Sequence, residues 1–370
     1  MTWPDADRRI DRVVMAGGGT GGHLYPGIAV AREILRRHAA AQVSFAGTAR
    51  GLESTIVPRE GFPLDCIRSA GLKGKSWIAR LSGAALVPLG LADAWRLLSR
   101  RRPQVVVGLG GYSSGPVVLL AALRRVPAVV LEQNATPGLA NRLLARWVRA
   151  AAVAYEEALP HFRGKGFVTG NPVRPEFLRA ADTASAEPPA AGRRLLVLGG
   201  SQGARALNRA MVAAGTRLAA ATVDVVHQTG PRDLADVTVG YARAGVRARV
   251  EAFLDPVAPE MAAAALIVCR AGATTLSELA ALGRPAVLVP FAAATDDHQR
   301  RNAEVLAAAG AAVVIEERDL SGDRLAATAT ELLGAPGRLT SMGRAMRGFA
   351  RPDAAARIVD RLEELVASRG

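Results

Sequence analysis

Two glycine-rich turns, about 180 residues apart, are the parts of this sequence best suited to binding an anion. Residues 17–23 (GGGTGGH) follow the apolar run 13–16, and residues 199–204 (GGSQGA) follow the apolar run 195–198. A buried strand, a turn that only glycine can make and a helix N-terminus together present backbone N–H groups to a phosphate. The repetition predicts two nucleotide-fold domains and favours an enzyme that works in the cleft between them.

Neither turn carries a complete phosphate-binding fingerprint. The first lacks the Lys-Ser or Lys-Thr ending of a P-loop. It fits the dinucleotide pattern only loosely, because the next apolar run ends in Gly47 and Thr48 rather than in a carboxylate that would bind a cofactor ribose. We therefore expect no nicotinamide cofactor. The spacing of the cysteines and histidines does not indicate a metal site either.

Composition and charge narrow the class of protein. The 370 residues are 50% hydrophobic, enough for two or three folded domains, and the two cysteines indicate a reducing compartment. Residues 1–172 hold 23 Lys and Arg against 11 Asp and Glu, whereas residues 173–370 hold 24 against 22. The basic first half predicts an anionic partner. A membrane surface fits better than nucleic acid, because aromatic residues are only 4%. The alternative is an arginine-rich composition without a functional cause.

Short apolar runs alternate with amphipathic runs, which predicts parallel sheets covered by helices on both faces. The expected strands are residues 13–16, 43–48, 104–108, 128–131, 195–198, 223–227, 250–253, 266–269, 286–290 and 312–315. We also expect helices at 28–37 and 92–102, a hinge at 170–174, a loop at 180–192, and a last helix at 353–368 that returns to the first domain. The start of the chain has no signal-peptide pattern and no apolar run is long enough to span a bilayer, so we expect a cytoplasmic protein that is soluble or peripheral.

Seven motifs in a fixed order carry a resemblance to a known family. They are GGTGGHLYPG at 18–27, GGYSSGP at 110–116, EQN at 132–134, GNPVR at 170–174, GGSQGA at 199–204, CRAGATTLSE at 269–278 and DDHQRRNA at 296–303. Together they resemble the MurG family of peptidoglycan N-acetylglucosaminyltransferases, over about residues 13–312.

The resemblance implies an α/β protein of the GT-B class, with two Rossmann-like domains whose parallel sheets face an interdomain cleft. Residues 1–172, joined by the helix within 353–370, would be the acceptor and membrane domain, and residues 173–352 would bind UDP-GlcNAc. The implied reaction is an inverting transfer of GlcNAc to the 4-hydroxyl of MurNAc in undecaprenyl-pyrophosphoryl-MurNAc-pentapeptide, which converts lipid I to lipid II. The family further implies a peripheral protein on the cytoplasmic face of the bacterial membrane that uses no cofactor. Cell-wall or division proteins are compatible partners.

Side chains within these motifs suit the parts of a nucleotide sugar. Glu278 lies early in an expected helix, where a carboxylate can accept both ribose hydroxyls; the alternative is a charge that the helix dipole stabilises. Arg174 can pair with the uridine or the diphosphate, and Gln299, with His298 as the alternative, suits GlcNAc. The implied substrate-binding residues are Thr20, Gly21, Gly22, Asn134, Arg174, Ser201, Gln202, Leu254, Ala273, Thr274, Thr275, Glu278, His298 and Gln299.

Two residues are candidates for the base that deprotonates the acceptor hydroxyl. His23 directly follows the first glycine turn, and an imidazole suits proton transfer near neutral pH. Glu132 is the competing candidate, and either side chain could instead make a structural hydrogen bond. An inverting transfer needs one base and a stabilised leaving group, without a carboxylate nucleophile.

Residues 71–81 (GLKGKSWIARL) place apolar side chains at helical spacing among basic ones. That composition is typical of a shallow membrane-contact element. The expected contacts are Lys73, Lys75, Trp77, Ile78, Arg80 and Leu81. The alternative is the start of a helix that faces the protein core.

Two other classes of function remain compatible with the sequence. Another GT-B enzyme, such as a glycolipid glycosyltransferase or a UDP-GlcNAc 2-epimerase, would share the fold, and an epimerase would need no acceptor. A non-catalytic nucleotide-sugar sensor or membrane scaffold would share the basic first half of the chain. The presence of His23, Asn134, Glu278 and Gln299 together argues against a protein without activity.

Overall fold

The computed structural model describes residues 9–69, 77–183, 193–200, 203–294 and 297–368, with the backbone alone for residues 77–87. The chain divides into two compact units. Unit 1 comprises Met1–Arg174 together with Arg351–Gly370, and unit 2 comprises Pro175–Ala350. The last helix of the chain therefore belongs to the same unit as the first strand.

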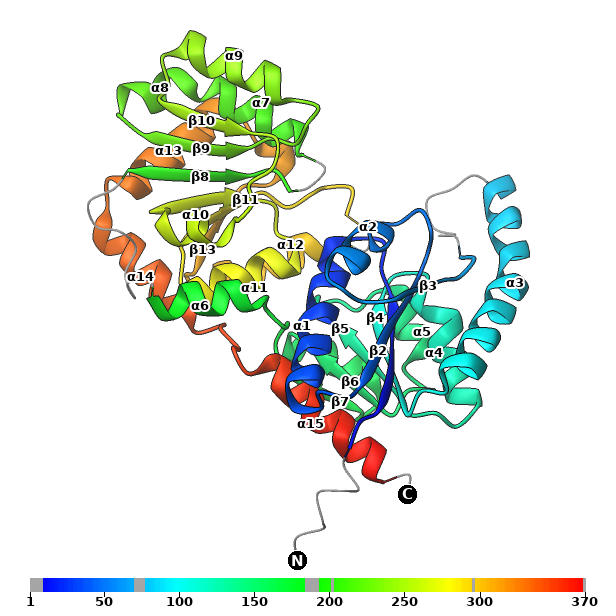
Figure 1. Ribbon diagram of the computed structural model, residues 1–370. Coiled ribbons are helices and arrows are strands. Elements are labelled where there is room, and N and C mark those ends of the chain that lie inside the picture. Colours follow the sequence, from blue (N-terminus) through cyan, green and yellow to red (C-terminus); the bar gives the residue numbers. More distant parts are fainter. Residues whose placement is uncertain (1–8, 70–76, 184–192, 201–202, 295–296, 369–370) are drawn as a thin grey trace, which may run out of the picture. The chain divides into compact units, whose positions relative to one another are not determined.

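Unit 1 is built on a seven-stranded parallel sheet with the order β3-β2-β1-β4-β5-β6-β7 (Figure 1). Its strands are β1 (Arg12–Gly17), β2 (Gln42–Gly47), β3 (Leu64–Cys66), β4 (Val105–Gly110), β5 (Ala128–Glu132), β6 (Ala150–Val153) and β7 (Gly166–Val168). Val13 and Met15 pack into one apolar cluster, whereas Val14 and Ala16 pack into another. Successive side chains of a strand point to opposite faces, so this run of apolar residues buries both faces of the sheet.

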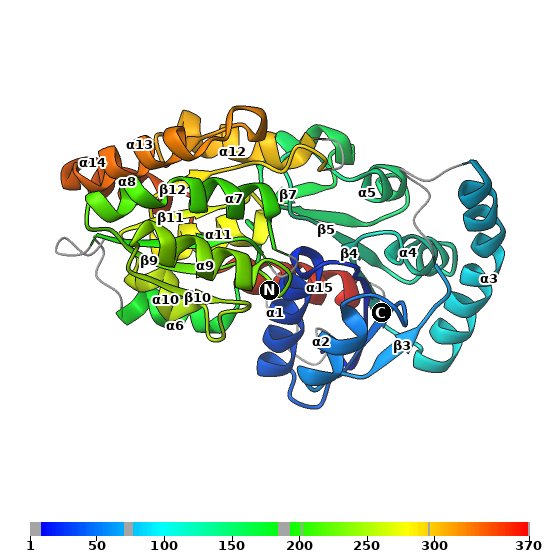
Figure 2. The same ribbon diagram turned by 90° about the horizontal axis from the view of Figure 1, so that it is seen from above.

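Helices cover the two faces of this sheet. On one face α1 (Gly21–Arg37) and α15 (Ala354–Ala367) lie side by side, and Arg37 pairs with Asp360 at 2.5 Å (Figure 1). On the other face α4 (Ser114–Leu123) contacts both α3 (Trp77–Arg101) and α5 (Leu139–Leu144), as Figure 2 shows. The remaining described helices of the unit are α2 (Glu53–Arg59) and the 3-10 helix η2 (Glu156–Phe162).

Unit 2 repeats this plan with a six-stranded parallel sheet in the order β10-β9-β8-β11-β12-β13. Its strands are β8 (Arg194–Leu198), β9 (Asp224–Gln228), β10 (Ala248–Glu251), β11 (Leu266–Cys269), β12 (Ala286–Leu288) and β13 (Ala312–Val314). Its helices are α6 (Pro175–Thr183), α7 (Arg205–Ala213), α8 (Gly215–Ala220), α9 (Leu234–Ala244), α10 (Ala258–Ala263), α11 (Ala273–Leu282), α12 (His298–Ala308), η4 (Glu317–Asp319), α13 (Gly322–Leu333) and α14 (Pro336–Arg347).

The order of the strands reverses once in each sheet. In unit 1 the reversal lies between β1 and β4, and in unit 2 it lies between β8 and β11. At such a point the loops leave the carboxyl ends of two neighbouring strands in opposite directions, and ligands of open α/β sheets bind there. Each glycine-rich turn directly follows one of these strands, so both turns lie where a ligand is expected.

The α/β fold with two parallel sheets that the sequence predicts is confirmed, and every expected strand is present with its ends shifted by at most two residues. The expected loop at 180–192 is wrong for residues 180–183, which complete α6, while residues 184–192 lie outside the described part of the chain. The helix expected at 92–102 begins at Trp77 and continues through Pro88. Sequence patterns missed β3, β6 and β7, which are strands of three or four residues. Within the described residues, no helix has the length and apolar character to cross a membrane.

Candidate active site

The carboxyl ends of β1 and β4 approach each other so closely that only glycine fits. Gly17 pairs in register with Gly110, and a Cβ on Gly17 would lie 2.5 Å from the Gly110 carbonyl oxygen. A Cβ on Gly111 would lie 2.7 Å from the oxygen of Gly18. Gly17, Gly110 and Gly111 also have φ values of +143°, +99° and +75°, which favour glycine. The turn after β1 and the turn after β4 therefore form one continuous backbone surface at this point of the sheet.

His23 lies on that surface, in the first turn of α1. The oxygen of Thr20, the N-cap residue, accepts hydrogen bonds from the backbone N–H groups of His23 and Leu24, both at 3.2 Å. The Thr20 hydroxyl lies 3.1 Å from His23 Nδ1, and a Cβ on Gly110 would lie 2.8 Å from the imidazole Cδ2. The structure thus places His23, Thr20, Gly21 and Gly22 together at the carboxyl ends of β1 and β4.

Glu132, the competing base candidate, ends the next strand, β5, and is only 3% exposed. One carboxylate oxygen accepts hydrogen bonds from the Asn134 backbone and side chain at 3.0 and 3.1 Å. The other accepts from Gly138 N at 3.0 Å and Asn141 Nδ2 at 2.9 Å. Burial raises the pKa of this carboxyl, while these donors oppose the shift. The arrangement gives Glu132 the geometry of a group that orders the loop carrying Asn134.

Arg174, the last residue of the GNPVR motif, lies against α1. Its guanidinium is 4.5 Å from the centroid of the Tyr25 ring, an arrangement in which the positive charge faces the π-electrons. Tyr25 is two residues from His23, and its ring lies 3.1 Å from where a Cβ on Gly21 would be. Arg174 and the first glycine turn are therefore brought to the same end of α1, although about 150 residues separate them in sequence.

Sequence reasoning missed a buried carboxylate beneath the first glycine turn. Glu53, the first residue of α2, is 1% exposed, and its oxygens accept hydrogen bonds from Gly19 and Thr48. Sequence analysis considered only the residues at the end of β2, Gly47 and Thr48, as the place of a carboxylate. Glu53 lies a few residues further along, in α2, and its carboxylate binds groups of the protein itself.

The second glycine turn is held against the end of β9. Gly199 N donates to the Gln228 carbonyl at 3.0 Å, and a Cβ on Gly203, whose φ is +76°, would lie 2.5 Å from the Thr229 oxygen. Asn208 Nδ2 on the following helix, α7, donates to the same Thr229 oxygen at 3.0 Å. Ser201 and Gln202, which are among the implied substrate-binding residues, lie outside the described residues.

A buried histidine supports this arrangement. His227, 0% exposed, has Nε2 3.1 Å from Asn208 Oδ1 and Nδ1 2.9 Å from the Tyr241 hydroxyl. Burial lowers the pKa of His227 to about 3, so the ring is neutral at physiological pH. No spacing rule finds this network, because His227 lies within an apolar strand and its partners come from α7 and α9.

Glu278 lies beside the other strand at the reversal point of unit 2. It is the sixth residue of α11, which begins at Ala273 and includes Thr274 and Thr275 in its first turn. Because Glu278 is in the middle of the helix and only 5% exposed, stabilisation by the N-terminal dipole does not explain it. Burial raises the pKa of Cys269, at the end of β11, to about 12, and the Glu278 charge adds to the shift.

The other expected donor contacts also follow strands of unit 2. Leu254 lies in the loop after β10, and its backbone N–H donates a hydrogen bond to Gln228 Oε1 at 3.0 Å. Gln299, in the first turn of α12, uses Oε1 to accept from Phe291 N at 3.0 Å, which fixes the loop after β12. His298 precedes it as the first residue of the same helix. Both candidates for the GlcNAc contact therefore lie at the carboxyl side of this sheet.

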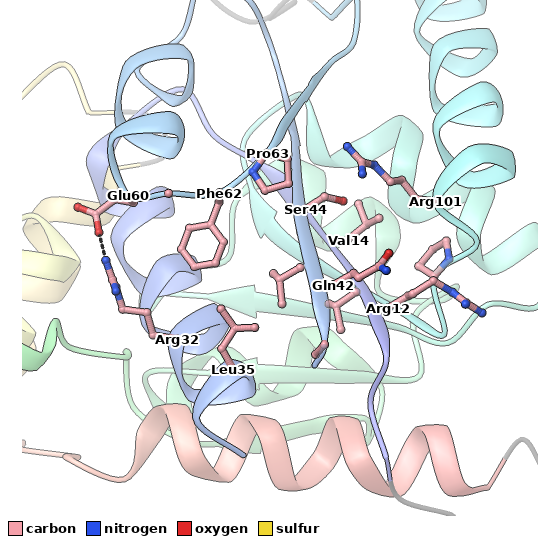
Figure 3. A pocket seen from close by; sticks show the side chains of 15 residues that line it. Arg12, Val14, Arg32, Leu35, Gln42, Ser44, Glu60, Phe62, Pro63 and Arg101 are labelled. Carbon is pink, nitrogen blue, oxygen red and sulfur yellow. Dashed lines mark hydrogen bonds and ion pairs between the residues drawn. The ribbon is translucent and has the colours of Figure 1, made fainter. Parts of the chain in front are cut away.

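A cavity of about 420 Å³ in unit 1 lies at the opposite end of the sheet (Figure 3). Arg12 and Gln42, the first residues of β1 and β2, line it together with Arg32, Phe62 and Arg101. The glycine turns leave the other ends of these strands. The cavity is therefore separate from the candidate active site, and we do not assign the transfer reaction to it.

Comparison with known proteins assigns the chain to a family. The model of the glycosyltransferase family 28 N-terminal domain matches residues 13–153, and that of the C-terminal domain matches residues 194–358. A transferase of Anaeromyxobacter sp. (strain K), named UDP-N-acetylglucosamine--N-acetylmuramyl-(pentapeptide) pyrophosphoryl-undecaprenol N-acetylglucosamine transferase, is 48% identical over 364 residues, which cover 97% of this chain and 94% of the relative. The enzyme of the same name from Myxococcus xanthus is 45% identical, with coverages of 94% and 91%.

Solved structures agree with this assignment. The crystal structure of Acinetobacter baumannii MurG matches with a TM-score of 0.77 and 30% identity, covering 96% of this chain and 99% of that one. The UDP-GlcNAc 2-epimerase of Neisseria meningitidis, bound to UDP-GlcNAc, matches with a TM-score of 0.64 at 14% identity, which shows a shared fold alone. The chain belongs to glycosyltransferase family 28, and within it to the MurG family.

Proposed function

We propose that this protein transfers GlcNAc from UDP-GlcNAc to the 4-hydroxyl of MurNAc in undecaprenyl-pyrophosphoryl-MurNAc-pentapeptide. The observation that carries the proposal is that each of the two sheets has its glycine turn and its polar motif residues at the point where the strand order reverses. The curated relatives, which match over nearly the whole chain, are named for this reaction.

Unit 2 is the proposed donor site. Backbone N–H groups at the start of α11 and in the turn after β8 would stabilise the diphosphate that leaves with uridine. Glu278, on the same helix, would accept the two ribose hydroxyls. Gln299, whose Oε1 is fixed by Phe291 N, would offer its Nε2 group to a GlcNAc hydroxyl.

Unit 1 is the proposed acceptor site, with His23 as the general base. In the tautomer that donates Nδ1–H to the Thr20 hydroxyl, Nε2 is the nitrogen that would take the proton from the MurNAc 4-hydroxyl. The hydroxyl oxygen then forms a bond to C1 of GlcNAc as the bond from C1 to UDP breaks. His23 is favoured over Glu132, because both oxygens of Glu132 already accept hydrogen bonds within its own loop. Asn134 and Arg174 would contact the substrates from this unit.

The outer surface of α3, α4 and α5 is the proposed contact with the membrane. Large apolar side chains on or next to these helices are 39–65% exposed. They include Trp95, Leu123, Leu139, Leu143 and Trp147. The guanidinium groups of Arg124 and Arg146 lie 4.7 and 4.8 Å from the ring centroids of Trp95 and Trp147.

Exposed tryptophans with basic side chains around them are typical of a surface that inserts shallowly into an anionic leaflet. Lys73 and Lys75 of the segment proposed from sequence lie outside the described residues, as do the side chains of Trp77, Ile78, Arg80 and Leu81. The backbone of Trp77 begins α3, the first of the helices proposed to contact the membrane. Binding there would place the protein peripherally on the cytoplasmic face of the membrane that holds its lipid-linked acceptor.

Transfer of radiolabelled GlcNAc from UDP-GlcNAc to a lipid I analogue tests the proposal. We expect lipid-linked disaccharide that forms only when the acceptor is present. The second candidate is epimerisation, which the fold also supports in the Neisseria meningitidis enzyme. Conversion of UDP-GlcNAc to its 2-epimer without an acceptor would favour that activity and refute the transfer.

A further inference from the structure

The first glycine turn of unit 1 is held by a carboxylate of the protein itself. Glu53 Oε2 accepts a hydrogen bond from Gly19 N at 2.7 Å. Its other oxygen, Oε1, accepts from Thr48 N at 2.8 Å and from the Thr48 hydroxyl at 2.7 Å. These donors lower the pKa of Glu53 despite its burial, so the group is an anion near neutral pH. Glu53 therefore ties the turn after β1 to the end of β2.

Three glycines make room for this carboxylate. A Cβ on Gly18 would lie 2.7 Å from the Glu53 carboxylate, and one on Gly47 would lie 2.6 Å from its Cγ. A Cβ on Gly51 would be closer still to the carboxylate. In contrast, a Cβ on Gly19 would meet nothing within 4 Å. The N–H of Gly19 thus points toward Glu53, and the side of Gly19 where a Cβ would be faces open space.

The hydrogen bond from Gly19 N to Glu53 fixes the Gly18–Gly19 peptide, which directly precedes the residue that orients His23. Thr20 follows Gly19 directly, and as the N-cap of α1 it contacts His23 through both its carbonyl oxygen and its hydroxyl. A rotation of the Gly18–Gly19 peptide would displace Thr20 and so move both of these contacts. We propose that Glu53 is a positioning residue for transfer, which sets the orientation of the His23 imidazole through Gly19 and Thr20. This inference rests on the proposed function of His23 as the base.

The inference also explains how the two glycine turns differ. A turn of this type presents N–H groups to an anion, and here a carboxylate of the chain accepts one of them. An ionised Glu53 beneath the turn also opposes binding of a second negative charge at Gly19. We therefore expect the first turn to orient a catalytic side chain, while the diphosphate of UDP is bound by the proposed donor site of unit 2.

The variant Glu53→Gln tests the inference, because it keeps the shape of the side chain. A glutamine that still accepts from Thr48 must direct its NH2 group at Gly19 N–H, which sets donor against donor. We expect kcat to fall about 10- to 100-fold from misplacement of the base, with the KM for UDP-GlcNAc and the Kd for UDP unchanged. Thr48→Val removes one of the three hydrogen bonds and should show a smaller decrease of the same kind.

Glu60→Gln is the matched control. Glu60 follows α2, and its carboxylate pairs with Arg32 at 2.5 Å at the opposite end of the sheet (Figure 3). We expect its kinetic constants to equal those of the wild type. A decrease in kcat of Glu60→Gln as large as that of Glu53→Gln would show that any disturbance of α2 suffices, and would overturn the inference.

A double-mutant cycle separates positioning of His23 from a general loss of structure. If Glu53 acts through His23, Glu53→Gln should reduce kcat less than about twofold in a protein that already carries His23→Ala. An equal reduction in both backgrounds would overturn the inference, as would an unchanged kcat of Glu53→Gln in the wild-type background.

Hydrogen exchange provides a readout that does not depend on transfer. Glu53→Gln should increase exchange of backbone amides in residues 17–24 and leave residues 195–212 of unit 2 unchanged. Unchanged exchange in residues 17–24 would show that Glu53 does not hold the turn. A wild-type protein without transferase activity would refute the proposed function, while the exchange experiment would still decide whether Glu53 fixes the Gly18–Gly19 peptide.

Discussion

Arg174 stacks on Tyr25, with its guanidinium carbon 4.5 Å from the centre of the ring. This contact joins the end of the GNPVR motif to the helix that carries His23. Since Arg174 is the last residue of unit 1 before Pro175, the contact fixes the position at which the chain leaves the unit. A residue that sequence alone assigns to the nucleotide is therefore held against the helix that carries the proposed base.

Replacement of His23 by alanine should lower kcat about 10²- to 10⁴-fold, the usual contribution of a general base. The affinity for UDP should remain that of the wild type, because the proposed donor residues belong to unit 2. His161→Ala, at an exposed position of unit 1, is the control. Steady-state kinetics and UDP titration distinguish these effects. Near-normal kcat in His23→Ala would remove His23 from this role and make Glu132 the next candidate.

Replacement of Glu278 by alanine should raise the KM for UDP-GlcNAc about 10-fold or more. Hydroxyls left without a charged partner in a buried site typically cost about 1–3 kcal/mol of binding. The control is Glu331→Gln, since Glu331 is 67% exposed and pairs with Arg338 elsewhere in unit 2. If Glu278→Ala folds and keeps the wild-type donor KM, Glu278 does not bind the ribose.

Membrane binding should depend on the exposed apolar side chains of α3 to α5. We expect the double variant Leu143→Ala, Trp147→Ala to bind vesicles containing anionic lipid less than the wild type, and added salt to weaken binding of both. Activity should fall on a long-chain acceptor and persist on a short, water-soluble one. The control is Val239→Ala, which removes an exposed apolar side chain of unit 2 and should change neither vesicle binding nor activity. An equal loss of activity on both acceptors would refute a role in membrane contact.

The stability of unit 2 should fall as the pH decreases from neutrality. The unfolded chain protonates His227 at about pH 6.5, whereas the folded chain does so only near its pKa of about 3, so protons favour the unfolded state between these values. One such group lowers the free energy of unfolding by about 1.4 kcal/mol between pH 7.5 and 5.5.

His227→Gln should be less stable than the wild type at pH 7.5 but should lose less stability on going to pH 5.5. Urea unfolding followed by circular dichroism at the two pH values measures the difference. Tryptophan fluorescence is an internal control, because Trp3, Trp77, Trp95 and Trp147 all belong to unit 1. The same pH dependence in both proteins would show that His227 does not cause it.

Sequence patterns predicted the strands because each lies within a continuous apolar run. They failed for β3 and β7, which have three residues each and carry no such run, and they also missed β6, although its four residues are apolar. The helical spacing at 71–81 and the helix expected at 92–102 were not joined, although α3 continues from Trp77 through Pro88 to Arg101. Local sequence therefore suffices where burial of a whole strand or helix decides the structure.

Candidate site residues could be named from sequence only where they are grouped in motifs. His23 lies in such a motif, next to a turn whose glycines are required by close backbone contacts, and Glu278 lies in the motif at 269–278. Glu53 and His227 could not be found in this way, since the groups they contact are brought to them only by folding. Their partners, Gly19 and Asn208, lie 34 and 19 residues away in sequence.

The configuration of the new glycosidic bond tests the account most directly. UDP-GlcNAc carries an α-linked sugar, and a base-assisted attack on C1 opposite the leaving diphosphate must invert that centre. We predict that the product formed from UDP-GlcNAc and a lipid I analogue contains GlcNAc in β-linkage to the 4-position of MurNAc, as measured by NMR of the released disaccharide. An α-linked product, or no acceptor-dependent product, would contradict the account.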